Sequence, residues 1–172
     1  MSNTGTADSS FESAGRKKHG AASILRSHAA DEADSDQRAE QMIRYRRNYP
    51  LNPSDIVRVF ESSGIQRPTT DLRRITHMFQ NANLVLSAWA GRRLVGVCRA
   101  LTDFSYCCYL SDLAVEREFQ KRGIGRTLID RLRSVIGEEV TLIVVSAPST
   151  VDYYPNVGFE PIQNGYIITR QR

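Results

Sequence analysis

The residues best suited to chemistry form one short stretch, Gln120-Lys121-Arg122-Gly123-Ile124-Gly125-Arg126, directly before an amphipathic segment. The first turn of a helix has amide N–H groups without partners inside the helix, at the positive end of its dipole. Two glycines let an anion approach that backbone, and three cationic side chains add charge. The stretch therefore predicts a phosphate-binding turn, with a glycine-rich helix start that binds no ligand as the alternative.

Two common phosphate loops do not fit this stretch. A Walker loop ends in Gly-Lys-Ser/Thr, whereas Arg126 follows Gly125. The dinucleotide fingerprint has a third glycine three residues after the second, and this sequence has Leu128 there. The remaining pattern is Gln-x-x-Gly-x-Gly.

This turn needs a strand before it and a helix after it, and the residue pattern supplies both. Apolar residues recur on one helical face from Gly123 to Ile136, and Gly137 ends the helix. Val140 to Val145 is nearly all apolar and β-branched, which predicts a strand buried on both faces. Strand, helix and strand then form a right-handed crossover.

The preceding residues predict an alternation of helices and strands. Asn52 or Ser54 can cap a first helix that ends at Gly64, and Thr69 or Thr70 can cap a second. Gly91-Arg92 forms a hairpin turn. We expect strands at 42–46, 84–90, 93–102 and 106–115, a short helix at 150–156 and a final hairpin at 160–170.

Three further motifs stand in register with the phosphate turn. They are Leu94-Val95-Gly96-Val97-Cys98-Arg99, Leu110-Ser111-Asp112-Leu113-Ala114-Val115 and Tyr153-Tyr154-Pro155-Asn156-Val157-Gly158-Phe159. Together with the Gln-x-x-Gly-x-Gly turn, they resemble the third strand, fourth strand, C-terminal signature and acetyl-CoA loop of the GNAT N-acetyltransferase superfamily. The resemblance covers about residues 42–172.

The resemblance implies an α/β fold: one mixed, mostly antiparallel sheet with a central, splayed parallel strand pair, flanked by helices. It also implies acetyl-CoA as acyl donor and no metal. The fourth strand would pair with the pantetheine arm and the turn would hold the pyrophosphate. The implied cofactor-binding residues are Leu113, Ala114, Val115, Gln120, Lys121, Arg122, Gly123, Ile124, Gly125 and Arg126.

Proton transfer defines the catalytic candidates. A thioester is attacked by a neutral amine, so a base must remove a proton from the ammonium form. Asp112 is the best candidate base, with a carboxylate paired to arginine as the alternative; Asp103 and Glu116 are weaker candidates. Tyr154 occupies the position of the family's general acid, which protonates the leaving thiolate.

Two more roles follow from the resemblance. The N–H of Leu113 or Ala114 can donate to the oxyanion of the tetrahedral intermediate. Tyr153 matches the apolar member of the tyrosine pair and is expected to be buried.

The implied function is acetyl transfer to a primary amine of a small molecule. A non-catalytic acyl-CoA sensor and an acetyltransferase acting on a protein amine are the alternatives. The segment Gly165-Tyr166-Ile167-Ile168 offers an exposed strand edge, which predicts a homodimer.

Composition sets the remaining limits. The chain has 172 residues, of which 41% are hydrophobic, but no apolar run approaches the length of a membrane span. Residues 41–172 carry eighteen basic and twelve acidic residues, without a dense basic block interleaved with aromatics, so no nucleic-acid partner is expected. Three cysteines without ligand spacing indicate a reducing compartment, the cytoplasm. Residues 1–40 are polar and predict a flexible tail.

Overall fold

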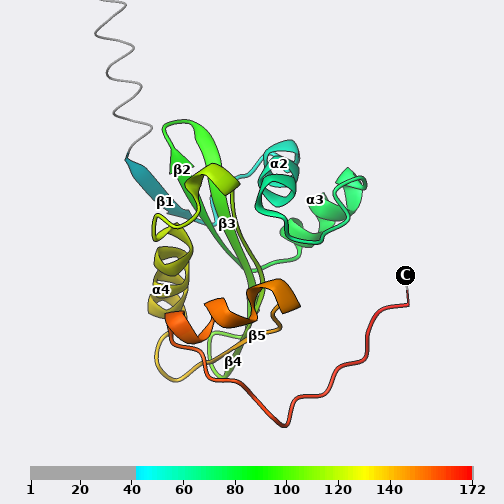
Figure 1. Ribbon diagram of the computed structural model, residues 1–172, viewed down its shortest axis with the longest axis vertical. Helices are drawn as coiled ribbons and strands as arrows, with labels where there is room; N and C mark the ends of the chain where they lie inside the picture. The colour runs from blue at the N-terminus through cyan, green and yellow to red at the C-terminus, as the bar shows by residue number, and fades with distance from the viewer. Residues whose placement is uncertain (1–41, 172) are drawn as a thin grey trace, which may run out of the picture. The chain divides into compact units, whose positions relative to one another are not determined.

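The computed structural model describes residues 42–171 of the chain (Figure 1). The predicted tail, residues 1–40, lies outside the described residues. The domain boundary near residue 41 therefore stays a prediction.

One sheet of five strands organises the described residues. Its order is β1 (Ile43–Arg47), β2 (Leu84–Ala90), β3 (Arg93–Thr102), β4 (Cys107–Val115) and β5 (Thr141–Val144). Neighbouring strands are antiparallel except β4 and β5, which are parallel. The predicted mixed, mostly antiparallel sheet is confirmed. The parallel pair lies at one edge of this sheet, and no strand follows β5 in residues 145–171.

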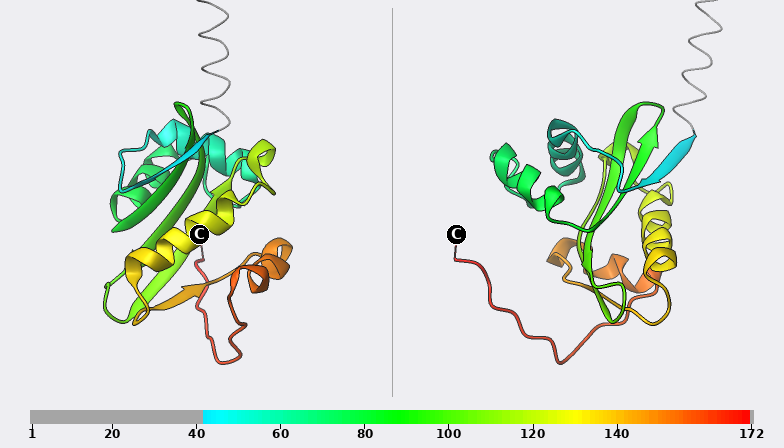
Figure 2. Two further views of the ribbon diagram at one scale, coloured as in Figure 1. Left: turned by 90° about the vertical axis from the view of Figure 1, so that its left-hand side faces the viewer. Right: turned by 180° about the vertical axis from the view of Figure 1, so that it is seen from behind.

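Helices cover both faces of the sheet. Helices α2 (Pro53–Ser63) and α3 (Leu72–Gln80) lie on one face, and α4 (Ile124–Ile136) lies on the other (Figure 2). A short 3-10 turn, η1 (Arg117–Phe119), leads from β4 toward α4. None of the helices in residues 42–171 has the length and apolar character needed to cross a bilayer.

Local capping explains where α2 and α3 begin. The Asn52 side chain accepts a hydrogen bond from the Ser54 N–H at 3.0 Å, as one of the two predicted caps. At α3 the predicted threonine cap is wrong: the Asp71 carboxylate accepts from the Arg74 N–H at 2.9 Å. Asp71 directly precedes the first helical residue, so its carboxylate reaches a free amide of the first turn and also favours the positive end of the helix.

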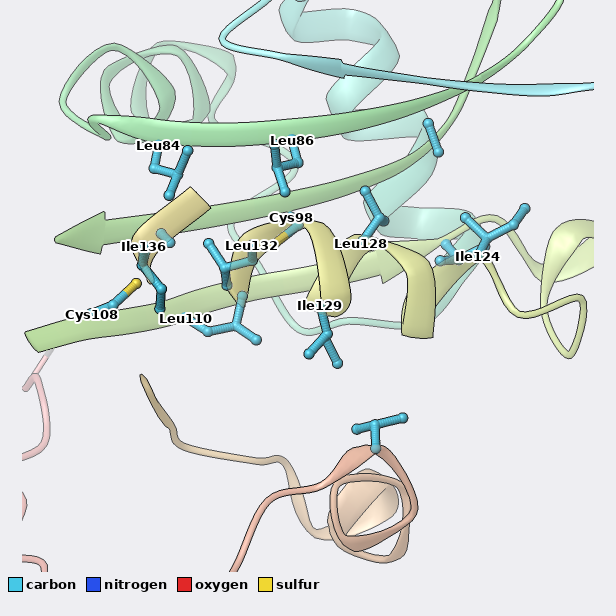
Figure 3. Close-up of a cluster of buried hydrophobic side chains, with 14 of the residues drawn as sticks. Leu84, Leu86, Cys98, Cys108, Leu110, Ile124, Leu128, Ile129, Leu132 and Ile136 are labelled. Carbon is cyan, nitrogen blue, oxygen red and sulfur yellow. The ribbon is translucent and has the colours of Figure 1, made fainter. Parts of the chain in front are cut away.

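The larger core lies between α4 and the sheet. Leu128, Ile129 and Leu132 of α4 are fully buried, and Figure 3 shows the side chains of α4 packed near Leu110, Cys98 and Leu86 of the strands. A second cluster on the opposite face joins α2 and α3 to β3 and β4. Both the turn before α4 and the loop between α2 and α3 are thereby anchored to one rigid sheet.

Strand β5 is covered on one face only. Leu142 and Val144 pack against the α4 core, whereas Ile143 and Val145 are exposed. The prediction of a strand buried on both faces is wrong, because the hydrophobic cluster of α2 and α3 includes residues of β3 and β4 and none of β5.

The C-terminal part also differs from its prediction. Two 3-10 turns, η2 (Pro148–Tyr153) and η3 (Pro155–Val157), replace the short helix, and each begins at a proline. No strand forms within residues 160–170, so the predicted hairpin is wrong. Pro161 lacks a backbone N–H near the start of the expected first strand, which weakens strand pairing there. The homodimer expected from residues 165–168 stays a prediction.

Candidate active site

Strands β4 and β5 separate part-way along their length. Their pairing runs from Cys107 and Thr141 to Leu110 and Val144, whereas β4 continues to Val115. Ser111 is an extra residue in β4, because Arg99 pairs with Asp112 and Ala100 with Leu110. Such a bulge increases local twist and ends pairing. The β4 segment 111–115 therefore has a free edge facing away from β3.

The direction of backbone groups along this free edge follows from one hydrogen bond. The Glu116 N–H donates to the Val95 carbonyl on β3 at 2.9 Å. Since backbone N–H and C=O directions alternate along a strand, those of Leu113 and Val115 point away from β3, into the opening. The N–H of Ala114 points toward β3. The sequence suggested the N–H of Leu113 or of Ala114 as the oxyanion donor. The alternation supports Leu113, because its N–H is the one that points into the opening.

The predicted phosphate turn lies next to this opening. Gly123 precedes α4 with a φ of 79°, a left-handed conformation that glycine adopts readily. The Thr127 N–H donates to the Gly123 carbonyl at 2.9 Å and closes the first turn. The amides of Ile124, Gly125 and Arg126 precede that bond and have no partner within the helix. This backbone fits an anionic diphosphate.

The side chains of the turn make different contacts. The Gln120 side chain holds the turn to β4, because its amide donates a hydrogen bond to the Val115 carbonyl at 2.9 Å. Arg122 lies over the Phe119 ring at 5.1 Å, and the Arg126 guanidinium donates to the Asn156 carbonyl. Lys121 is exposed. The turn is therefore held in place from both β4 and the C-terminal segment.

Tyr154 lies half-buried beside the α4 core. Its ring makes edge contacts with those of Phe159 and Tyr153, at centroid distances of 5.4 and 5.5 Å. Burial raises the pKa of the Tyr154 hydroxyl, while the nearby Arg67 guanidinium opposes the shift. Negative charge on Asp112 also raises the pKa of this hydroxyl. A protonated phenol at this place can act as an acid.

The Tyr153 side chain brings its hydroxyl close to the turn before α4, a position that the sequence interpretation missed. Its hydroxyl lies at the phosphate turn, only 2.7 Å from where a Cβ atom on Gly125 would stand. Tyr153 is half-buried, and burial raises the pKa of its hydroxyl. A Cβ atom at position 125 would therefore require the Tyr153 side chain to shift. The signal available in the sequence was a tyrosine at position 153, where the family motif has an apolar aromatic residue.

Asp112 is fully engaged by two arginines. It is buried, and its two oxygens accept from Arg67 Nε and Arg99 Nε respectively. Arg67 also donates to the Ser111 carbonyl at 2.8 Å, and Arg99 to the Ser111 hydroxyl at 2.7 Å. This geometry supports the paired-carboxylate alternative for Asp112. Neither arginine was assigned to Asp112 from the sequence; Arg67 lies 45 residues away in the chain, and Arg99 pairs with Asp112 across β3 and β4.

The two weaker base candidates also have structural partners. Asp103 accepts from three backbone N–H groups of residues 105–107, which lower its pKa to about 2. Glu116 is fully buried between Arg58 and Arg93. Within residues 42–171, no group of three or more potential ligands among His, Cys, Asp and Glu is arranged to hold a metal ion.

A comparison with models of protein families identifies the family of this chain. The model of the "Acetyltransferase (GNAT) domain" matches residues 53–167, which is more than half of the chain. The chain belongs to the GNAT acetyltransferase family. The GNAT match includes β4, the turn at 120–126 and Tyr154, and the family uses acetyl-CoA.

Individual relatives of this GNAT chain are distant. A curated relative, "GCN5-related N-acetyltransferase 2, chloroplastic" of Arabidopsis thaliana, is 33% identical over 76 residues, which are 43% of this chain and 30% of that protein. The chain thus matches less than a third of that relative's length.

Solved structures confirm the fold. A probable acetyltransferase of meticillin-resistant Staphylococcus aureus, SA2161, has 19% identity and a TM-score of 0.64, covering 75% of this chain and 100% of its own. The aminoglycoside N-acetyltransferase AAC(6')-Iy, in complex with CoA, has 15% identity and a TM-score of 0.58, covering 76% and 96% respectively.

Proposed function

We propose that this GNAT chain transfers the acetyl group of acetyl-CoA to a primary amine of a small molecule, by direct attack on the thioester. The observation that carries the proposal is the opening between β4 and β5. It leaves one backbone edge of β4 free, the amides before α4 have no partner within the helix, and Tyr154 follows β5 in the chain and packs against the α4 core, which supports the proposal.

The donor would bind through backbone groups. The amides of residues 124–126 suit the pyrophosphate, and the free N–H and C=O of Leu113 with the free N–H of Val115 suit the amide groups of the pantetheine arm. Lys121 and Arg122 add positive charge near the diphosphate. An aminoglycoside acetyltransferase with the same fold is named as a complex with CoA, which supports this donor.

The chemistry then needs three groups. The neutral amine attacks the thioester carbonyl, and the N–H of Leu113 donates to the oxygen that becomes negative. The carbon–sulfur bond breaks, and the Tyr154 hydroxyl donates its proton to the leaving thiolate. The raised pKa of Tyr154 keeps this hydroxyl protonated at the pH values where an amine begins to lose its proton.

The ammonium proton needs an acceptor. Asp112, the candidate base from the sequence, has both oxygens hydrogen-bonded to arginines. We propose that Asp112 acts by holding Arg67 and Arg99 in position, and that water reached through the opening takes the proton from the amine.

A non-catalytic acyl-CoA sensor is the second candidate. The engaged state of Asp112 is the observation in its favour, because a binding module needs no base. Tyr154 distinguishes the two, since a binding module has no use for an acid beside the thiolate.

One assay tests the proposed function. The purified chain is incubated with acetyl-CoA and a panel of primary amines, with free CoA thiol as the readout and mass spectrometry of the amines as confirmation. We expect turnover with at least one small amine. Binding of acetyl-CoA without acetylation of any amine would favour the sensor, and acetylation confined to protein amines would contradict the small-molecule substrate.

The cytoplasm is the proposed location of the protein. The Arabidopsis relative is named as chloroplastic, so cell fractionation is the experiment that tests this proposal.

A further inference from the structure

We propose that the acceptor carries an anionic group, a carboxylate or a phosphate, in addition to its amine, and that a pocket beside α3 holds this group. The inference rests on the proposed acetyl transfer and specifies the substrate of the same site.

The pocket lies between one face of α3 and the end of β3. Its volume is about 500 Å³. Arg73, Arg74 and His77 line it from α3, and Arg99 and Leu101 line it from β3. A pocket of this size holds a small molecule, with Leu101 offering apolar contact.

Positive charge predominates at this pocket. Asp71 is its only lining carboxylate, and the side chain of Asp71 caps α3 by accepting from the Arg74 N–H. Among residues 42–171, neither Arg73 nor Arg74 forms an ion pair with a carboxylate. Two guanidinium groups at the rim are therefore available for a carboxylate or a phosphate, whose geometry they match.

The inner end of the pocket is joined to the candidate active site. Arg99 lines the pocket and is bonded to Asp112, which also accepts from Arg67. Asp112 directly precedes Leu113 in β4, beyond the point where β4 and β5 separate. An acceptor with its anionic end among the arginines of α3 would therefore direct its amine past Arg99 toward this part of β4.

This cluster has one positive charge in excess, because two guanidinium groups share the single carboxylate of Asp112. Arg99 is nearly fully buried, so water screens its charge less than that of a surface arginine. Nearby positive charge disfavours an ammonium and lowers its pKa. The cluster would therefore favour the neutral amine that the reaction needs, and it would repel a polyamine.

The experiment uses four series of linear primary amines with matched chain lengths. Their far ends carry a carboxylate, a phosphate, a neutral carboxamide or a second ammonium group. We measure kcat/KM for each series with the free-thiol assay at fixed ionic strength. The expected order is anionic, then neutral, then cationic, with about tenfold or more between the anionic and the cationic series. Comparing carboxylate with phosphate shows which anion the pocket prefers.

The variant Arg73→Glu/Arg74→Glu tests whether this pocket causes the order. Both side chains are exposed, so we expect the variant to fold, which its melting temperature and its acetyl-CoA affinity check. It should reduce kcat/KM for the anionic series by about tenfold or more and raise it for the diamines. Arg92→Glu is the matched control: Arg92 is an exposed arginine in the β2–β3 turn, and its reversal should leave the order unchanged.

The possible failures are distinguishable. If the chain binds acetyl-CoA but acetylates none of the four series or of the wider amine panel, the proposed function falls and this inference falls with it. If amines are acetylated without preference for an anion, or if the preference survives the double variant, this inference alone is overturned.

Discussion

The two sides of the opening between β4 and β5 differ in their chemical groups, which are mainly backbone on one side and side chains on the other. The proposed donor side consists mainly of backbone: the free edge of β4 and the amides before α4, with glycines at 123 and 125. The proposed acceptor side consists of side chains, with Arg67 and Arg99 around Asp112. A site made of backbone depends on a local conformation, whereas a site made of side chains depends on which distant residues meet.

The largest expected effect is on the acceptor side and concerns stability. Asp112→Ala leaves two arginines without their carboxylate, one of them nearly buried, and should lower the free energy of unfolding by about 3–5 kcal/mol. Urea unfolding followed by circular dichroism measures this. Glu118→Ala is the control, because this exposed carboxylate pairs with Arg93 at the surface and should cost less than about 1 kcal/mol. Equal losses in both variants would contradict a structural role for the Asp112 cluster.

The next effect is on the donor side and concerns affinity. Gly123→Val forces a β-branched residue into a left-handed conformation and distorts the amides before α4, so acetyl-CoA affinity should fall by about 100-fold. Calorimetric titration measures this. Gly137→Val is the matched control, since Gly137 also has a positive φ and open space around it, but ends α4 at the opposite end. Both variants should lose stability, and only Gly123→Val should lose affinity.

A smaller effect is expected at Tyr153, which contributes a side chain to the backbone-built donor side. Tyr153→Phe removes the hydroxyl next to Gly125 and should weaken acetyl-CoA binding about fivefold, the size of one net hydrogen bond. The value of kcat at saturating donor should stay near that of the wild type. Tyr106→Phe, at an exposed tyrosine, controls for the substitution itself. Unchanged affinity in Tyr153→Phe would exclude the hydroxyl from donor binding.

The contrast between local backbone conformation and distant side-chain contacts also explains which features could be predicted from the sequence. Strands β2 and β3 have the predicted bounds, and α4 begins one residue later than predicted, because alternation, helical spacing and glycines are local signals. The glycine turn before α4 was predictable for the same reason, and phosphate binding by this turn stays a prediction.

Arg67, one of the two arginine partners of Asp112, was not predictable. Arg67 lies in the loop between α2 and α3, and no residue pattern shows which carboxylate it meets across the fold. The C-terminal hairpin failed for a related reason. The apolar residues at 166–168 suggest a strand, but strand formation also needs a paired neighbour, which the local sequence does not specify.

The central claim is that Tyr154 connects the two sides as the acid that protonates the leaving thiolate. The measurement is steady-state kinetics of Tyr154→Phe with its best amine, together with calorimetric acetyl-CoA affinity. We predict a loss of about 100-fold or more in kcat and kcat/KM alike, with affinity near that of the wild type, because the hydroxyl acts as the carbon–sulfur bond breaks. Turnover of Tyr154→Phe at the wild-type rate would contradict the account.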